Sequence, residues 1–418
     1  IRSAFADFLA RTAKDPYAAW YSSANNLYED EFETRLYRLA SGKERPANIE
    51  LPADAPKAVW FMDCGEMVAN SDLENLEKNV SLSFRSSPFG SGNHTHSNQN
   101  AFNLHYGGHA VYRSVGHYMN FCDPHNLLSY RNTRAHNTML INGIGQPFTP
   151  EAHGYIVRMF NGDNISYALG DASDAYCGIS NIRLWKNSFD KYNLNQGPEN
   201  GFGETTLKKY RRHIFLLHPN KVVVYDELEA DGPVRWDWLL HSPVKFDINA
   251  NECILKTVNE GYGFSSVAQL FSSQMVSISQ TDKYAAEPNM ENAERGEDFT
   301  APWTLTASFG PGKSNRILTV IQIEADGKKS EKIERDGDIF RCGEWLIEAE
   351  LDSKRPGRLY IRNGKNNATF SYGNKEPEIN GKPYKCEWKD ASVLFDCVNG
   401  EWKTQEMSDQ RIQTMGKW

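Results

Sequence analysis

From residue 58 onward the chain is a succession of short runs rich in β-branched and aromatic residues, bounded by Gly, Asn, Asp or Pro. The clearest runs are SLSFRSS, HAVYRSV, NTMLING, RHIFLLH, KVVVYDELEA, RWDWLLHS, RILTVIQIEA and WLIEAEL. Such residues favour a pleated, half-buried backbone, and helical spacing is almost absent here. The pattern predicts a mainly β protein in which large antiparallel sheets pack face to face. Within it, HPNK at 218–221 and EADG at 229–232 predict turns between neighbouring strands.

The beginning of the chain has a different pattern. IRSAFADFLARTA and EDEFETRLYRLASG place apolar residues at helical spacing, and Asp15-Pro16 between them is typical of a helix start. A Pro-rich stretch, RPANIELPADAPK, then ends the helical part and predicts a linker. Towards the C-terminus, short strands and turns predict a small terminal β-unit. The predicted division is a helical segment at 1–45, a β-sandwich domain at 46–350 and a small C-terminal β-domain at 351–418.

Length and charge limit the classes of function that this chain can have. At 418 residues it exceeds what one hydrophobic core usually supports, so two or more domains are expected. The formal charge of -8 argues against a nucleic-acid-binding protein, which normally carries a basic surface. No apolar run reaches the length of a membrane span. Because the sequence begins with Ile and shows no signal peptide, we expect a processed product or a fragment.

Histidines are concentrated in one part of the sequence. Eight of the eleven lie in a single stretch: His94, His96, His105, His109, His117, His125, His136 and His153. The first two stand one residue apart in GSGNHTHSNQN, at residues 90–100. On an extended strand, residues i and i+2 point to the same face, so the two imidazoles are expected to lie side by side. The pattern suits a metal site, a catalytic site or a polar strand edge.

His94, His96 and His136 are the strongest candidates for a functional site, because the residues around them fit no core pattern. A His-x-His pair and a third histidine on a later strand can hold a metal in a cupin-like jelly roll, for oxygenase or isomerase chemistry. The predicted sheet is too extensive for a lone jelly roll. Histidines beside arginines also suit β-elimination on a uronic-acid polysaccharide, which must neutralise the C6 carboxylate, remove the C5 proton and protonate the leaving oxygen at C4.

Two segments of this region resemble a known family. SSPFGSGNHTHSNQNAFNLHYGGHAVYRSVGHY, followed by HNLLSYRNTRAHNTMLINGIGQ, resembles the central β-domain of the heparinase II/III-like polysaccharide lyases, which are related to exo-acting alginate and heparin lyases. The resemblance implies an (α/α) toroid followed by an antiparallel β-super-sandwich, with sugar bound in the cleft between them. This chain is then expected to hold the end of the toroid and the sandwich half. The expected partners are the missing toroid domain and an anionic polysaccharide.

By this resemblance His94 matches the position of the family's sandwich-borne catalytic histidine. His96 and His136 match positions that ligate a structural zinc in some members, which implies one Zn²⁺ as a cofactor. The family's catalytic Tyr, and an Asn or His that holds the substrate carboxylate, come from the toroid. Where the zinc-binding members have an acidic residue, this chain has HAVYRSVG, which places Arg113 or a neighbour there. An arginine cannot ligate a cation and repels it. Either another acid, such as Asp123, completes the site, or Arg113 replaces the charge of the ion.

Amide and guanidinium groups near the histidines are predicted to contact substrate. These residues are Asn93, Gln99, Arg113, Arg131 and Arg134. The amides suit sugar hydroxyls, and a guanidinium fork suits a carboxylate or sulfate. We therefore expect a periplasmic or secreted polysaccharide lyase that cleaves a heparin-like or alginate-like glycan by β-elimination. The alternative is a non-catalytic carbohydrate-binding β-sandwich.

Overall fold

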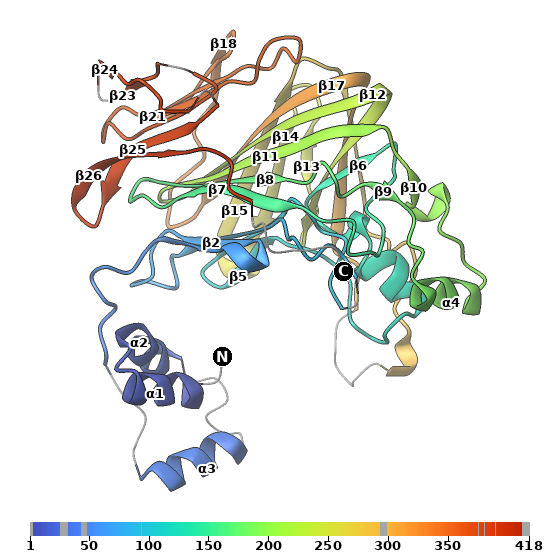
Figure 1. Cartoon of the computed structure of the whole chain (residues 1–418), viewed down its shortest axis with the longest axis horizontal. Coiled ribbons are helices and arrows are strands. Elements are labelled where there is room, and N and C mark those ends of the chain that lie inside the picture. Colours follow the sequence, from blue (N-terminus) through green and yellow to red (C-terminus); the bar gives the residue numbers. More distant parts are fainter. Residues whose placement is uncertain are drawn as a thin grey trace. The chain divides into compact units, whose positions relative to one another are not determined.

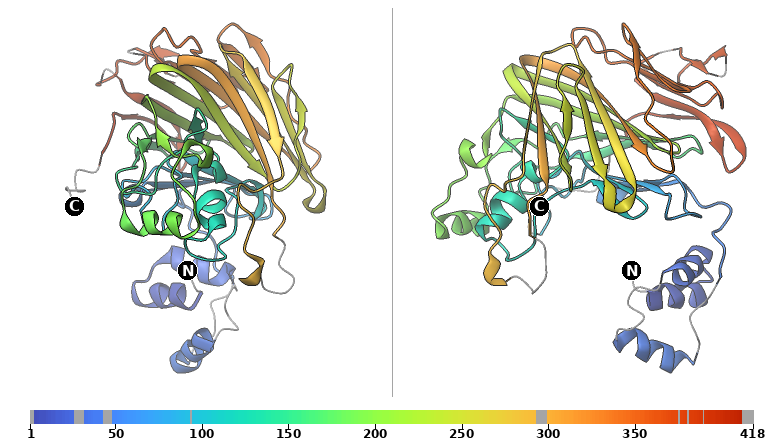
Figure 2. Two further views of the ribbon diagram at one scale, coloured as in Figure 1. Left: turned by 90° about the vertical axis from the view of Figure 1, so that its right-hand side faces the viewer. Right: turned by 180° about the vertical axis from the view of Figure 1, so that it is seen from behind.

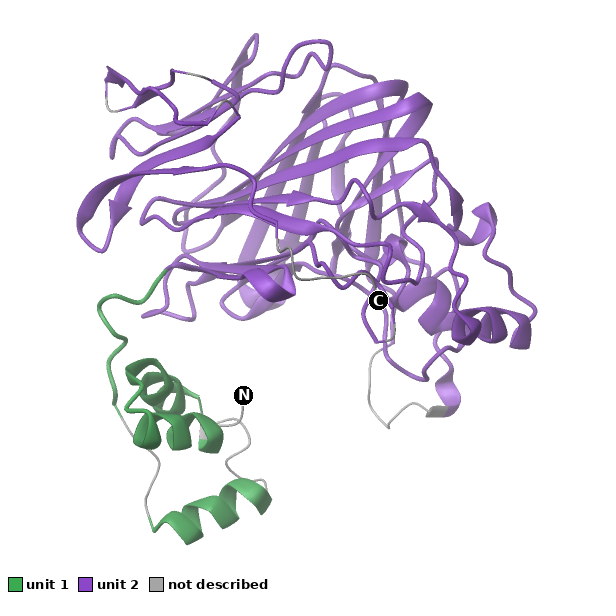
Figure 3. Ribbon diagram, in the orientation of Figure 1, with its two compact units in different colours: residues 1–56 green, residues 57–418 purple. Residues whose placement is uncertain are grey.

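The computed structural model divides the chain into two compact units, Ile1–Pro56 and Lys57–Trp418 (Figure 3). The boundary falls at the end of the Pro-rich stretch that predicts a linker. The first unit is helical, and the second consists mainly of strands (Figure 1). The structure describes residues 3–25, 32–42, 48–92, 94–292, 299–374, 376–379, 381–388 and 390–411.

The helices of the first unit begin and end as local sequence rules require. Its described helices are α1 Ser3–Thr12, α2 Pro16–Ala24 and α3 Phe32–Ser41. Asp15 caps α2, because its Oδ1 accepts hydrogen bonds of 2.9 and 3.1 Å from the N–H groups of the second and third helical residues. Pro16 occupies the first position, where a missing N–H has no cost, so the predicted helix start is confirmed. The buried carboxylate of Asp7 on α1 binds Arg38 of α3 at 2.7 Å and joins the two helices.

The strands of the second unit pair in antiparallel fashion throughout its described residues. A five-stranded sheet contains β1 Ala58–Phe61, β2 Glu66–Asn70, β3 Val80–Arg85, β4 Ala101–Tyr106 and β5 His109–Tyr112. A ten-stranded sheet contains β6 Met139–Ile141, β7 Tyr155–Phe160, β8 Ile165–Asp171, β11 Leu207–Leu217, β12 Lys221–Ser242, β13 Asp247–Asn249, β14 Ile254–Asn259, β15 Phe264–Ser272, β16 Val276–Thr281 and β17 Trp303–Glu324. A seven-stranded sheet contains β18 Glu334–Asp336, β19 Ile339–Cys342, β20 Trp345–Ala349, β21 Leu359–Asn363, β22 Thr369–Tyr372, β25 Ser392–Val398 and β26 Glu401–Met407.

Shorter elements connect these sheets. Two small hairpins pair β9 Cys177–Gly178 with β10 Gly203–Glu204, and β23 Glu378–Ile379 with β24 Lys382–Pro383. The helical connections are α4 Arg183–Lys191, η1 Met62–Cys64, η2 Asn126–Tyr130, η3 Thr133–Ala135, η4 Pro198–Asn200, η5 Glu260–Tyr262 and η6 Met290–Asn292. Two of them, η2 and η3, lie in the second histidine-bearing segment, between β5 and β6.

The long strands β11, β12 and β17 run side by side through the second unit, as Figures 1 and 2 show from three sides. Both faces of this part of the sheet are buried. Along β12, Val222 and Val224 pack into one hydrophobic cluster, whereas Val223 and Tyr225 pack into another. Because neither face meets water, the strand is apolar at consecutive positions and not only at alternate ones.

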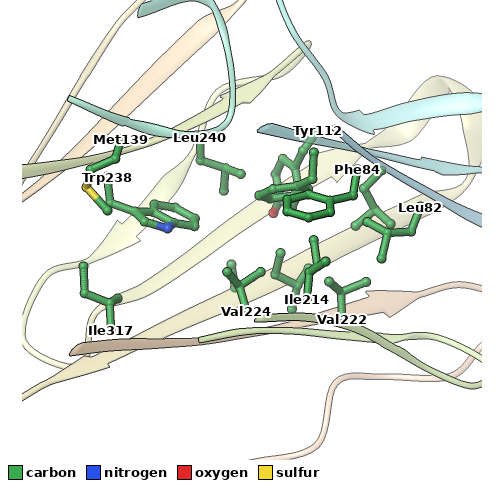
Figure 4. Close-up of a cluster of buried hydrophobic side chains, with 14 of the residues drawn as sticks. Leu82, Phe84, Tyr112, Met139, Ile214, Val222, Val224, Trp238, Leu240 and Ile317 are labelled. Atoms are coloured by element: carbon green, nitrogen blue, oxygen red, sulfur yellow. The ribbon is translucent and has the colours of Figure 1, made fainter. Parts of the chain in front are cut away.

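The first hydrophobic cluster lies between the five-stranded sheet and one face of the ten-stranded sheet. In Figure 4, Phe84 of β3 and Tyr112 of β5 point toward the apolar side chains of β11 and β12. Trp236 and Trp238 of β12 are fully buried in the same cluster. This packing fixes the positions of β3, β4 and β5. It therefore also fixes the loops at the ends of these strands, which carry the histidines.

The second cluster lies between the opposite face of the ten-stranded sheet and the seven-stranded sheet. Phe370 of β22 contacts Tyr167 of β8 and Phe215 of β11, with ring centroids 4.5 and 4.8 Å away. The three large sheets therefore stack as a layered sandwich with two cores. The predicted fold class is confirmed: the chain is mainly β and antiparallel, with a short helical beginning. The C-terminal sheet begins at Glu334, earlier than the boundary predicted at 351.

One of the two predicted turns is correct and the other is wrong. HPNK joins β11 to β12, whose pairing starts with Leu217 opposite Lys221. EADG lies inside β12 and does not reverse the chain. The pairing of β12 with β17 breaks after Glu229 and resumes at Val234. β12 and β17 each have 22 residues, and they pair on both sides of this break. EADG therefore produces an irregularity within a long strand and not a chain reversal.

Candidate functional site

The motif GSGNHTHSNQN lies in the connection between β3 and β4 and forms no strand in its described residues. The expected side-by-side placement of its two histidines is therefore wrong. His94 is exposed and stacks on Phe121, with ring centroids 4.7 Å apart. His96 contacts Tyr130 and His136 instead, with ring centroids 4.5 and 5.2 Å away. Turns replace the two-residue periodicity of a strand, so the two histidines reach different surroundings.

A glycine and a buried arginine shape this loop. Gly90 has a φ of 61°, and a Cβ atom there would overlap the backbone of Pro150. Arg131 is 1% exposed and donates a 2.6 Å hydrogen bond from Nη2 to the carbonyl of Thr95, which stands between the two histidines. Its guanidinium lies 4.3 Å from the ring centroid of Trp185, and burial lowers its pKa to about 10. Arg131 therefore positions the loop, and its burial leaves little surface for the predicted substrate contact.

His96 and His136 line a cavity of ≈ 370 Å³. Its walls come from β2, β3 and β4 and from the two segments that carry these histidines. Small-molecule sites in proteins typically measure about 300–1,000 Å³, so the cavity is large enough for a sugar ring. The polar part of its lining also includes Glu66, Arg85, Asn98, Asn103 and Ser114.

The two imidazoles in this cavity are neutral at pH 7. Burial, and then the charges of Arg131 and Arg85, lower the pKa of His96 to about 4. Burial also lowers the pKa of His136 well below its ordinary value. Nδ1 of His136 lies 2.8 Å from Oγ of Ser114, which fixes the orientation of the ring. Each neutral imidazole has one donor nitrogen and one acceptor nitrogen, so the pair can both donate hydrogen bonds to a polar ligand and accept them from it.

Two buried polar atoms of the cavity lack hydrogen-bond partners within the described residues. They are Nε2 of His136 and Oδ1 of Asn98. A buried polar group without a partner costs free energy, and native proteins nearly always satisfy such groups. The cavity is therefore built to receive hydrogen bonds from a ligand or from ordered water. Sequence reasoning missed Asn98, although it lies inside the quoted motif.

Arg85, at the end of β3, brings a positive charge to this cavity. It forms an ion pair with Glu66, which stands opposite it on β2. Its charge contributes to the lowered pKa of both His96 and His136. Sequence reasoning missed Arg85, because SLSFRSS predicts only a strand. The feature of the sequence that could have indicated Arg85 is its position at the end of a predicted strand, shortly before the histidine motif.

Arg113 does not line the cavity. Its side chain is exposed, and its neighbour Ser114 is the residue that contacts His136. Arg113 acts on His105, whose pKa is lowered first by burial and then by this guanidinium. Arg113 was expected to supply a positive charge beside His96 and His136. In the structure Arg85 supplies that charge. As an exposed guanidinium, Arg113 stays a predicted substrate contact.

The side chains that could act as metal ligands weaken the expectation of a zinc site. Within the described part of the chain, no group of three or more His, Cys, Asp or Glu side chains is close enough together to hold a metal ion. Asp123 does not supply the missing ligand, because it is buried beside η2, where Oδ1 accepts a 2.7 Å hydrogen bond from the N–H of Asn126. His96 and His136 offer two nitrogens, whereas structural zinc takes four ligands and is repelled by a nearby guanidinium. Among the residues that the structure describes, His96 and His136 therefore do not complete a zinc site.

We expect the purified 418-residue chain to contain far less than one zinc per molecule, and EDTA to leave its melting temperature unchanged. The physical reason is the incomplete ligand set and the charge of Arg85. Elemental analysis and thermal unfolding with and without chelator measure this. Stoichiometric zinc that is lost in His96→Ala, but kept in a His153→Ala control, would instead establish the metal site.

Two further predicted residues, Gln99 and Arg134, do not line the cavity. Gln99 is fully buried, and its Oε1 accepts a 2.6 Å hydrogen bond from the N–H of Ser87, so it holds the loop together. Arg134 is half-buried against Gly201, and burial lowers its pKa. Asn93 lies outside the described residues. The structure therefore brings His96 and His136 together, and places His94 on the neighbouring surface.

A comparison with known protein families identifies the family to which this sandwich belongs. The sequence model of the family described as Heparinase II/III-like, C-terminal, matches residues 53–337, and the chain belongs to this family. The predicted family is confirmed. No curated protein matches the chain.

Two solved structures show the same fold. A heparan sulfate lyase HepC mutant from Pedobacter heparinus superimposes with a TM-score of 0.56 at 12% identity, over 92% of this chain and 47% of that one. A structure of heparinase III gives a TM-score of 0.56 at 13% identity, over 91% of this chain and 47% of that one. The present chain thus spans less than half the length of these proteins. At such identities the likeness concerns the fold alone.

Proposed function

We propose that this chain is the sandwich part of a polysaccharide lyase that cleaves a uronate-containing glycan by β-elimination. The observation that carries the proposal is the cavity at His96 and His136, which combines the cation of Arg85 with buried polar atoms that lack partners. Membership of the heparinase II/III-like family supports it. The names of the structural neighbours, a heparan sulfate lyase and a heparinase III, point to the same class of reaction.

The chemistry requires three groups. A base removes the C5 proton, a double bond forms between C4 and C5, and the bond from C4 to the glycosidic oxygen breaks as that oxygen gains a proton. The C6 carboxylate must be neutralised for C5 to lose its proton. Arg85, whose present partner is Glu66, is the cavity group suited to a carboxylate, and His136 can donate or accept a hydrogen bond. His94, exposed on the neighbouring surface, is the proposed proton-transfer group.

A second wall of the site is proposed to come from an N-terminal α/α toroid. The helix α3 carries Phe32, Leu36 and Leu39, all of which are exposed. Their spacing of four and three residues places them on one face of the helix. An exposed apolar stripe of this kind is typical of a surface that packs against another element. Further toroid helices are the proposed occupants of this stripe.

A periplasmic or secreted location is proposed because a polymeric anionic glycan does not diffuse across a membrane. Among the residues that the structure describes, no helix is long and apolar enough to cross a bilayer. The seven cysteines are all free thiols in the structure. Fractionation of cells that produce the complete protein, with a cytoplasmic marker as the reference, tests the proposed location.

Ultraviolet absorbance of an unsaturated uronate product tests the proposed reaction. We expect the complete protein to release this product from at least one of heparan sulfate, hyaluronan and alginate. The 418-residue chain alone is expected to be folded but nearly inactive, because one wall of a cleft cannot orient the substrate. Binding of these glycans by the complete protein without any product would favour the non-catalytic alternative. Full activity of the 418-residue chain would place every catalytic group within it.

A further inference from the structure

The seven-stranded sheet has one face in the core and one face outside it. Side chains alternate along its strands, so Ile361 of β21 and Phe370 of β22 are buried in the second cluster. Tyr360 and Arg362 lie on the opposite, outer face. Almost all of this sheet lies beyond residue 337, where the family match ends. Its outer face is therefore separate from the cavity described above.

Aromatic and polar side chains form a row across four strands of this face. Arg362 of β21 stands opposite Thr369 of β22, and Thr369 stands opposite Phe395 of β25. Phe395 stacks on Trp402 of β26, with ring centroids 5.1 Å apart and planes tilted by 25°. Trp402 is 48% exposed. Neighbouring strands lie about 4.8 Å apart, so the row extends roughly 14 Å, which suits a short oligosaccharide.

A cavity of ≈ 230 Å³ lies at one end of this row. Because small-molecule sites typically measure about 300–1,000 Å³, this cavity suits one sugar ring and no larger ligand. The sheet and the β21–β22 turn supply most of the lining, and the hairpin of β23 and β24 supplies the rest. The lining residues are Tyr360, Arg362, Asn367, Thr369, Glu378 and Gly381.

The polar groups of this cavity can form hydrogen bonds in both directions. Arg362 forms no hydrogen bond or ion pair of its side chain within the described residues, so its N–H donors are available. The hydroxyl of Tyr360 donates a 3.4 Å hydrogen bond to the backbone carbonyl of Glu378. The amide of Asn367 offers a donor and an acceptor. Arg362 and Glu378 contribute one charge of each sign, so charge alone does not select an anion here. The aromatic rings beside the cavity favour a sugar that offers C–H faces and hydroxyls.

We propose that this face binds an uncharged pyranose unit of a glycan, with one ring in the cavity and an adjoining sugar stacked on the exposed ring of Trp402, against which Phe395 packs. Aromatic rings pack against the C–H faces of pyranoses, while the polar lining binds their hydroxyls. This inference does not depend on the proposed lyase function.

Affinity electrophoresis of the 418-residue chain through native gels that contain xylan, glucomannan or dextran tests the site. We expect at least one of these neutral glycans to retard the chain. Trp402→Ala and Arg362→Gln should each weaken the apparent affinity by about tenfold, the value of one aromatic stack or of one good polar contact. Tyr360→Phe keeps the ring and should retain most of the binding.

Two control variants separate this site from the rest of the chain. Arg341→Gln makes the same change of charge on the exposed side of β19, outside the cavity, and should bind as the unchanged chain does. His96→Gln alters only the other cavity and should also bind normally. Unchanged melting temperatures show that the variants are folded. Retardation by heparan sulfate alone would overturn the uncharged class of ligand. Absence of retardation in every gel, or an equal loss in Arg341→Gln, would overturn the site itself.

Discussion

His94→Ala in the complete protein is expected to lower lyase turnover by about 10²- to 10⁴-fold, the usual contribution of a positioned acid or base. His94 is exposed in the same loop that carries His96 to the cavity, so it is available to a substrate that enters there. Its ring contact is with Phe121. Loss of this surface stack should leave the fold intact, so the effect should appear in kcat while the melting temperature stays unchanged.

His109→Ala is the matched control for this experiment. His109 is also exposed and also stacks on an aromatic ring, that of Tyr262, with centroids 3.6 Å apart. It lies on β5 and does not line the cavity. The control should keep its turnover. Retained turnover in His94→Ala would remove that residue from the mechanism, and an equal loss in both variants would point to general damage of the sandwich.

Acidification from pH 7 to pH 5 is expected to lower the melting temperature by on the order of 10 °C. Burial lowers the pKa of His213 to about 4, of His218 to about 3 and of His241 to about 4. The unfolded chain binds these protons near pH 6.5. The stability present above pH 6.5 is therefore lost progressively as the pH falls toward 4. Each histidine contributes on the order of 2 kcal/mol to the loss at pH 5.

His218→Gln isolates the histidine part of this effect. Nε2 of His218 lies 3.0 Å from Oγ of Ser166 in the buried sheet, where an amide can keep a hydrogen bond. The variant cannot take up a proton, so its free energy of unfolding should fall by about 2 kcal/mol less between pH 7 and pH 5, and its melting temperature should fall correspondingly less. Glu227, whose pKa is lowered by His213 and Lys209 against its burial, contributes in the same direction and is unaffected by the variant. Equal melting temperatures of the unchanged chain at both pH values would contradict the prediction.

Local patterns predicted the class of fold because they act over a few residues. The consecutive apolar positions of KVVVY indicate a strand, and the structure adds that both of its faces are covered. The cap at Asp15 is equally local. EADG misled the prediction because turn propensity does not include the long partner strand β17, whose pairing resumes at Val234 and carries β12 onward.

The candidate site was predicted only in part. His96 and His136 lie forty positions apart in the sequence and were singled out together, and the structure places their rings in contact. The ion pair of Arg85 with Glu66 was not predicted, because it depends on the register in which β2 pairs with β3. Arg131 was expected to face substrate, since a guanidinium is usually solvated, yet an aromatic cluster encloses it.

The sequence by itself determined the β class, the helical beginning and the concentration of histidines between β3 and β7. These features follow from side-chain alternation, helix capping and composition, each of which is visible within a short segment. Only the tertiary structure decided that His94 faces solvent while His96 faces a cavity, and that Arg85 supplies the charge there. A cavity forms where distant segments are brought together by strand register and burial, so its charges and pKa values cannot be read from any one of those segments.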